Sequence, residues 1–296
     1  MMTSVLTLIA AEGLDDNTLS ALRQTLAAAG ADCAAADWLA PGRAADLVVR
    51  GIDRAAIVAV ARPHLAGLPV DWLVQAADNR RKMLLIADMD STIVQTETLD
   101  ELAAYAGLKD RIAAITARSM KGEIDFKDAL RLRVGLLAGL PEASLAATEA
   151  ATFLTPGAAL LVATMRRHGA YTLLVSGGFE YFTERVRRRC GFDADRANHL
   201  DIEKGKLTGT VREPILDRDA KLAYLEEFTA ARGLSAEQTL AVGDGANDLA
   251  MIRKAGLGVA FHAKPILADM AAFRVDHNDL TALLFAQGYR LDEFTL

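Results

Sequence analysis

Three short polar clusters, each directly behind an apolar run of strand length, limit most strongly what this chain can fold into. The apolar runs cover residues 83–87, 171–175 and 239–242. The clusters behind them are Asp88-Met89-Asp90-Ser91-Thr92, Ser176-Gly177-Gly178 and Gly243-Asp244-Gly245-Ala246-Asn247-Asp248. Such runs are typical of buried parallel strands, and ligands of an open α/β sheet bind beyond the carboxyl ends of its strands. The sequence therefore predicts an α/β fold with a doubly wound, mainly parallel sheet and the three clusters at one edge.

The carboxylates in these clusters require a positive partner. Asp88, Asp90, Asp244 and Asp248 would repel one another at one sheet edge, and their removal from water would be costly without a cation. Mg²⁺ fits, because it prefers an octahedral shell of oxygens from carboxylates, waters and a phosphate. The chain has two widely spaced cysteines and five histidines without HExxH or CxxC spacing, which argues against zinc.

Each cluster also has a plain structural explanation. Acidic residues are common in loops after strands, and the glycines of the other two clusters could serve only tight turns. All three in order, each behind its own strand, favour a site for a phosphate ester and a hard metal ion.

Residues 83 to about 274 resemble the haloacid dehalogenase superfamily of phosphatases, and within it the phosphoserine phosphatases. The matching stretches are Asp88–Thr92, Ser-Gly-Gly-Phe ending at Phe179, Asp219-Ala220-Lys221, and Gly243–Asp248 followed by Ala263-Lys264-Pro265. The resemblance implies a haloacid dehalogenase-like core that hydrolyses O-phospho-L-serine to L-serine and phosphate, the last step of serine biosynthesis.

The resemblance also implies catalytic roles. Asp88 is expected to attack phosphorus and form an aspartyl phosphate, which splits one difficult hydrolysis into two easier displacements. Asp90 is expected to protonate the leaving oxygen and then to activate water. Mg²⁺ would be held by the Asp88 side chain, the Asp90 backbone carbonyl and Asp244, with Asp248 supporting its water shell.

Donors are needed around the phosphate oxygens. The resemblance implies Ser176, the amide of Gly177, the backbone amides of residues 89–91, and Lys221, which would also steady Asp88. Asn247 would contact phosphate or orient Lys221. The alternatives are a solvated surface lysine and a turn or cap asparagine.

Residues 97–150 carry apolar residues at helical spacing and are predicted to form a helical cap that excludes water from the site. A pocket for phosphoserine needs an anion for the ammonium and a guanidinium for the carboxylate, and Glu97 and Arg133 match the family residues for these roles. Met120 and Phe126 match apolar residues that close over the ligand. The alternatives are an acid in a first helical turn for Glu97, a solvated face for Arg133, and cap core for Met120 and Phe126.

The chain of 296 residues is long enough for two domains. Residues 1–76 are predicted to form a small α+β domain of order βαββαβ, with strands near 4–10, 32–38, 46–50 and 70–74 and helices near 16–29 and 54–64. This order resembles the ACT-type regulatory module. Residues 76–82 are expected to be a linker to the phosphatase domain, 77–296.

Composition narrows the partners and the compartment. A net charge of −6 without an aromatic-basic stripe argues against nucleic acid. The chain lacks an uninterrupted apolar span of about 18 residues, which argues against a membrane protein. The chain has two cysteines far apart in sequence, which argues against stabilisation by disulfides and fits a reducing cytoplasm. Edge-strand pairing between N-terminal domains makes a homodimer a reasonable hypothesis.

Two other functions remain open at the level of sequence. One is a phosphotransferase that moves phosphate from phosphoserine through Asp88 to another alcohol, such as homoserine. The other is a non-catalytic amino-acid sensor dominated by the N-terminal domain, which the intact set of Asp88, Asp90, Lys221 and Asp244 disfavours.

Overall fold

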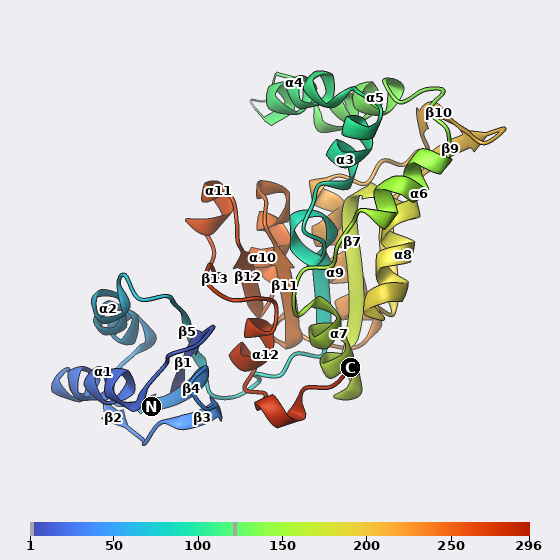
Figure 1. Cartoon of the computed structure of the whole chain (residues 1–296). Coiled ribbons are helices and arrows are strands. Elements are labelled where there is room, and N and C mark those ends of the chain that lie inside the picture. Colours follow the sequence, from blue (N-terminus) through green and yellow to red (C-terminus); the bar gives the residue numbers. More distant parts are fainter. Residues whose placement is uncertain (1–2, 121–122) are drawn as a thin grey trace.

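The larger part of the molecule is built on a six-stranded parallel sheet (Figure 1). The computed structural model describes residues 3–120 and 123–296, without the side chain of Met120. The sheet has the order β13-β12-β11-β6-β7-β8, and every neighbouring pair is parallel. The strands are β6 Leu84–Asp88, β7 Tyr171–Phe179, β8 Ala194–Asn198, β11 Thr239–Gly243, β12 Leu257–Phe261 and β13 Phe273–Val275. The predicted doubly wound, mainly parallel sheet is confirmed.

Helices cover both faces of this sheet, which explains why a central strand such as β6 is apolar over most of its length. In β6, Leu85 and Ala87 belong to one hydrophobic cluster, and Leu84 and Ile86 belong to another. The first cluster includes side chains of α7, α8 and α12, and the second includes side chains of α9 and α10. These helices are α7 Ala158–Arg167, α8 Glu180–Cys190, α9 Arg218–Ala231, α10 Leu249–Lys254 and α12 Ala282–Ala286. Successive side chains of a strand point to opposite faces, so both faces bury apolar surface.

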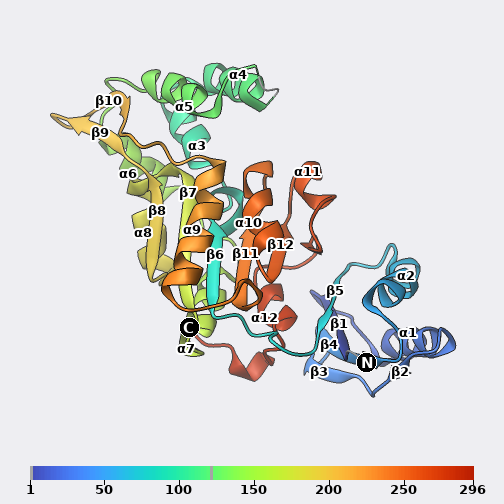
Figure 2. The ribbon, with the colours of Figure 1, turned by 180° about the vertical axis from the view of Figure 1, so that it is seen from behind.

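Four helices lie beyond the carboxyl ends of the central strands, as Figures 1 and 2 show. They are α3 Thr98–Tyr105, α4 Lys109–Met120, α5 Phe126–Gly135 and α6 Ala143–Ala150. The buried apolar residues of this segment include Leu102, Ala103, Leu130, Val134 and Leu137. An antiparallel hairpin, β9 Leu200–Glu203 and β10 Lys206–Val211, packs beside α5. The helices thus form the expected cap.

The N-terminal residues form a second, antiparallel sheet of order β2-β4-β1-β5, with β3 also paired to β4. Its elements are β1 Ser4–Ala10, α1 Asp16–Ala28, β2 Asp32–Cys33, β3 Asp37–Ala40, β4 Ala44–Arg50, α2 Arg54–Leu65 and β5 Val70–Ala76. The expectation of one strand over 32–38 was wrong, since β2 and β3 are separate. Asp37 lies five positions after Asp32, whereas their partners Asp46 and Arg50 are four positions apart, so one residue must leave the ladder.

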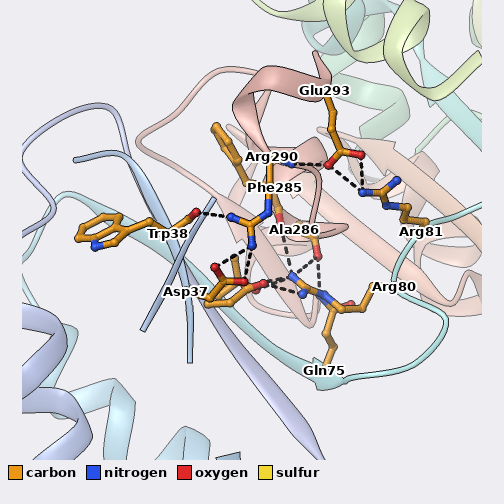
Figure 3. A network of polar contacts seen from close by, with 11 residues as sticks. Asp37, Trp38, Gln75, Arg80, Arg81, Phe285, Ala286, Arg290 and Glu293 are labelled. Carbon is orange, nitrogen blue, oxygen red and sulfur yellow. Dashed lines mark hydrogen bonds and ion pairs between the residues drawn. The ribbon is translucent and has the colours of Figure 1, made fainter. Parts of the chain in front are cut away.

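Polar contacts fasten the N-terminal sheet to the larger part (Figure 3). Arg80 forms an ion pair with Asp46 at 2.6 Å, with 14% and 6% of the two side chains exposed. It also donates to the carbonyl oxygen of Ala286 at 3.4 Å. Arg290 binds both carboxylate oxygens of Asp37 at 2.7 Å. The stretch predicted as a linker therefore takes part in a buried contact.

A second fastening is made by Asp71 on β5. Its carboxylate accepts from the backbone amides of Asp276, His277 and Asn278, at 2.8 to 3.2 Å. The side-chain amide of Asn278 donates to Asp71 at 2.8 Å and to the carbonyl oxygen of Ile9 at 3.0 Å. The contact joins β5 to the loop that follows β13, the edge strand of the parallel sheet. Within the described residues, no helix is long and apolar enough to cross a membrane.

Candidate active site

The three polar clusters meet at the carboxyl ends of β6, β7 and β11, which are neighbours in the sheet. Asp88 is the last residue of β6, and Asp244 follows the last residue of β11. The second cluster was expected to be a turn beyond its strand, but β7 continues to Phe179. The register between β7 and β8 shifts between Val175 and Phe179, so Ser176 and its glycines lie in an irregular strand end.

Three carboxylates and one lysine form the centre of the site. Oxygens of Asp88, Asp244 and Asp248 all lie within 4.8 Å of one another, and the three residues are buried. The Nζ atom of Lys221 lies 2.5 Å from Asp88 Oδ1 and 2.6 Å from Asp248 Oδ1. A Cβ atom on Gly243 would lie 2.3 Å from Asp248 Cγ, so only glycine lets Asp248 approach this strand.

The charges in this centre do not balance. Burial raises the pKa of Asp88, Asp248 raises it further, and Lys221 only partly offsets both effects. Burial opposes the charge of Lys221, yet Asp248 and Asp88 raise its pKa, so the ammonium stays charged. Lys221 thus pairs with two of these three buried carboxylates, and all three offer only hard oxygen ligands. These residues fit a divalent cation such as Mg²⁺.

Two hydrogen bonds hold the carboxylate of Asp90 in place. Its Oδ1 accepts from the backbone amide of Thr98 at 2.8 Å, and its Oδ2 accepts from the Ser176 hydroxyl at 3.1 Å. Burial and the nearby charge of Glu97 raise the pKa of Asp90 to about 6. Such a carboxyl can hold or release a proton near neutral pH.

The other residues predicted around the phosphate lie close by. The Ser176 hydroxyl accepts from the amide of Gly178 at 2.8 Å. The backbone amides of residues 89–91 were expected to bind phosphate. That of Ser91 already donates to the carbonyl oxygen of Thr96 at 3.3 Å. Asn247 is exposed, and its Oδ1 would lie 2.4 Å from a Cβ atom on Gly245. Glycine therefore makes room for this side chain.

Of the predicted cap residues, Phe126 reaches this centre, and Arg133 lies in the cap beside Ala129 and Thr116. The Phe126 ring would be 3.6 Å from a Cβ atom on Gly177, so it contacts the β7 strand end. Arg133 is half-buried, and its guanidinium contacts the carbonyl oxygen of Ala129 at 3.3 Å and the Thr116 hydroxyl at 3.5 Å. Burial lowers its pKa. Among the described residues, no carboxylate lies within 4.0 Å of the Arg133 guanidinium. This leaves it able to bind the carboxylate of a ligand. The side chain of Met120 lies outside the described residues.

Glu97 joins the cap to the catalytic loop. It is the N-cap of α3, where an acid is favoured by the helix dipole, but its side chain makes no capping hydrogen bond. Its Oε1 instead accepts from the Ser91 hydroxyl at 3.0 Å and from Lys264 Nζ at 3.3 Å. Ser91 has a positive φ of 56°, a conformation that is uncommon for residues other than glycine. The loop geometry thus points Ser91 toward Glu97.

Similarity to known proteins agrees with this geometry. Residues 85–253, more than half of the chain, match the model of the haloacid dehalogenase-like hydrolases. The chain belongs to this family. The resemblance to this family that the sequence motifs indicated is therefore confirmed.

Relatives with curated names and solved structures narrow the similarity. A phosphoserine phosphatase of Streptomyces coelicolor is 40% identical over 255 residues, which cover 86% of this chain and 62% of that protein. The solved structure of a probable phosphoserine phosphatase from Vibrio cholerae has a TM-score of 0.79 at 30% identity and covers 98% of this chain and 88% of its own. A phospho-aspartyl intermediate analogue of phosphoserine phosphatase has a TM-score of 0.64 at 39% identity and covers 69% and 98%. This hydrolase spans less than two thirds of the length of the Streptomyces protein.

Sequence reasoning gave no role to Lys264, which lies at the site of this hydrolase. Its Nζ atom lies 3.0 Å from Asp244 Oδ2 and 3.3 Å from Glu97 Oε1. Burial opposes its charge, but Asp244 and Glu97 raise its pKa. The signal was available, because Lys264 follows β12, the neighbour of β11, and so obeys the same rule for strand ends.

Proposed function

We propose that this protein hydrolyses O-phospho-L-serine to L-serine and phosphate through an aspartyl phosphate on Asp88. One observation carries the proposal: a buried carboxylate in contact with Lys221 lies at the sheet edge where Asp90, with a pKa of about 6, can exchange protons. The names of the relatives from Streptomyces coelicolor and Vibrio cholerae support the choice of substrate.

The reaction would proceed in two displacements. In the first, an oxygen of Asp88 bonds to phosphorus, the bond from phosphorus to the serine oxygen breaks, and Asp90 gives its proton to that oxygen. In the second, Asp90 takes a proton from water, whose oxygen bonds to phosphorus as the bond to Asp88 breaks. The carboxyl of Asp90 ends protonated, as it began. The phospho-aspartyl analogue of a relative supports this route.

Mg²⁺ would be held by the side chains of Asp88 and Asp244 and the backbone carbonyl of Asp90, with Asp248 supporting its water shell. When bound, it would offset the repulsion between the carboxylates and the phosphate dianion. Lys221 keeps Asp88 in one orientation through the 2.5 Å contact and would also face the phosphate.

Recognition would divide between the strand ends and the cap. Ser176, the amide of Gly177, Lys221 and Asn247 would bind phosphate oxygens. Glu97 would take the substrate ammonium, and Arg133 the carboxylate. The apolar residues that would close over the ligand are Phe126 and Met120.

The domain roles belong to the same proposal. Residues 1–76 would be an ACT-like regulatory or dimerisation domain, and residues 77–296 a phosphatase domain with its cap at about 97–150. We place the enzyme in the cytoplasm and propose a homodimer. Light scattering of the full chain tests the dimer, and a mass of one chain would exclude it.

Steady-state rates for a panel of small phosphomonoesters, with Mg²⁺ and with EDTA, test the proposed function. We expect the highest kcat/KM for O-phospho-L-serine and loss of turnover in EDTA. Serine and inorganic phosphate should appear in equal amounts, also when homoserine is added, since transfer to an alcohol would release less phosphate. Metal-independent turnover, or none with any ester, would contradict the proposal.

A further inference from the structure

Lys264 is fixed beside the site through its backbone. It lies between β12 and the short helix α11, Pro265–Ala268. Its amide donates to the carbonyl oxygen of Asp244 at 2.9 Å, and its own carbonyl oxygen accepts from the amides of Leu267 and Ala268 at 3.0 Å. The main chain therefore holds the start of the lysine side chain next to Asp244, whatever the side chain does.

The ammonium of Lys264 occupies two carboxylates at once. It lies 3.0 Å from Asp244 Oδ2 and 3.3 Å from Glu97 Oε1. Under the proposed function, Asp244 is a metal ligand and Glu97 binds the substrate ammonium. The Lys264 ammonium thus contacts the carboxylate that would bind Mg²⁺ and the carboxylate that would bind the substrate ammonium.

The exposure of Lys264 allows it to leave. Half of its side chain is exposed, whereas 1% of the Lys221 side chain is. A lysine has a flexible four-carbon stem and a strongly hydrated head, so a half-exposed one can move into water at small cost. Lys221, enclosed between two carboxylates, cannot.

We propose that Lys264 is a positioning residue that acts as a resident counter-cation: it bridges Asp244 and Glu97 until Mg²⁺ displaces it from Asp244 and the substrate ammonium displaces it from Glu97. The inference rests on the proposed function, which supplies the two incoming cations. Each binding step is then an exchange of cations, and until it occurs Lys264 keeps the two carboxylates from repelling each other.

Mg²⁺ binding to the substrate-free protein, measured by calorimetry, tests the first exchange. Lys264→Met removes a competing charge a few ångströms from a divalent ion, so Mg²⁺ should bind about tenfold more tightly. Lys264→Arg keeps the charge and should bind Mg²⁺ within about threefold of the wild type. Lys254→Met is the matched control, because Lys254 is equally exposed and pairs with Glu226 at 3.2 Å.

A split in KM between two esters tests the second exchange. O-phosphoethanolamine has an ammonium and no carboxylate, and the phosphate ester of 3-hydroxypropanoate has the reverse. Without Lys264, Glu97 should attract the first and repel the second, so the ratio of their KM values should shift by about fivefold or more toward the ammonium ester.

The outcomes distinguish a failure of the cation exchange from a failure of the proposed function. Unchanged or weaker Mg²⁺ binding in Lys264→Met, or an equal KM change for both esters, would overturn the exchange while an active wild type leaves the proposed function standing. A wild-type protein that binds no Mg²⁺ would overturn both.

Discussion

At the residue scale, the site is defined by a shortage of positive charge. Lys221 is shared by Asp88 and Asp248, and Lys264 is shared by Asp244 and Glu97. Neither lysine faces Asp90, which keeps its negative charge at a cost and therefore holds a proton longer than an ordinary aspartate.

The pKa of Asp90 predicts how stability depends on pH. Its value of about 6 in the folded state exceeds that of an unfolded aspartate, so ionisation destabilises the folded state as the pH rises from about 4 to above 6. Asp90→Asn does not ionise. In EDTA, its unfolding free energy relative to the wild type should be about 2 kcal/mol higher at pH 7.5 than at pH 4.5, reduced from the full shift because Asp90 is half-buried. Urea unfolding at both pH values measures this, and equal differences would contradict the assigned pKa.

Arg133 predicts a change in selectivity. Arg133→Ala removes the guanidinium that would read the substrate carboxylate, so KM should rise about 30-fold or more for phosphoserine and little for p-nitrophenyl phosphate. Arg118→Ala on α4 is a control, because Arg118 is exposed and pairs with Glu123 inside the cap. Equal changes for both esters would show that Arg133 does not read the carboxylate.

Asp88, Asp90 and Asp244 could be placed together from sequence because the first ends one apolar strand, β6, the second lies two residues further on, and the third follows another strand, β11. The role of Lys264 could not be read in the same way. Its partner Glu97 is 167 positions away, and their contact depends on how two loops face each other. The neighbours that raise the pKa of Asp90 are likewise fixed only by the folded chain.

At the scale of elements, the cap is tied to the core by exposed ion pairs. Arg131 and Lys127 on α5 bind Glu213 at 2.6 Å and Asp217 at 3.1 Å. Asp217 is the N-cap of α9, the helix that carries Lys221. The cap is thus linked to the helix that carries Lys221.

Removal of these ion pairs should make the cap open faster, with little loss in the free energy of unfolding. Lys127→Met combined with Arg131→Met should speed hydrogen exchange of α5, since exposed pairs contribute about 1 kcal/mol or less each and the core does not depend on them. Arg118→Met is again the control. Unchanged exchange in α5 would show that other contacts hold the cap.

The helices of the cap and the strands β6, β7 and β11 followed from apolar spacing. The split of β2 from β3 did not, because a ladder shift of one residue depends on the partner strand. The continuation of β7 through its glycines was missed for the same reason, since β8 pairs with it as far as Phe179.

At the scale of the whole molecule, the N-terminal sheet is not a freely hinged module. Arg80 and Asp46 form a largely buried pair, and Asp71 holds the loop after β13 (Figure 3 shows the Arg80 contacts). Composition alone made residues 76–82 look like a solvated linker, because a charged residue buried by a second domain has no local signature.

Because Arg80 forms this buried ion pair, its substitution should greatly lower the free energy of unfolding. Arg80→Met leaves the Asp46 carboxylate buried and short of its cation, so the unfolding free energy should fall by about 3 kcal/mol or more. Arg50→Met, which removes an exposed pair with Asp32, should change it by about 0.5 kcal/mol or less. Urea unfolding of both variants measures this, and similar small losses would show that Arg80 is dispensable.

The most direct test is to quench the enzyme within one turnover of ³²P-labelled phosphoserine and map the label by peptide mass spectrometry. The account predicts an acid-stable label on the peptide that contains Asp88, and none in Asp88→Asn, which should fold normally but not turn over. Label on another residue, or release of phosphate without any labelled peptide, would contradict it.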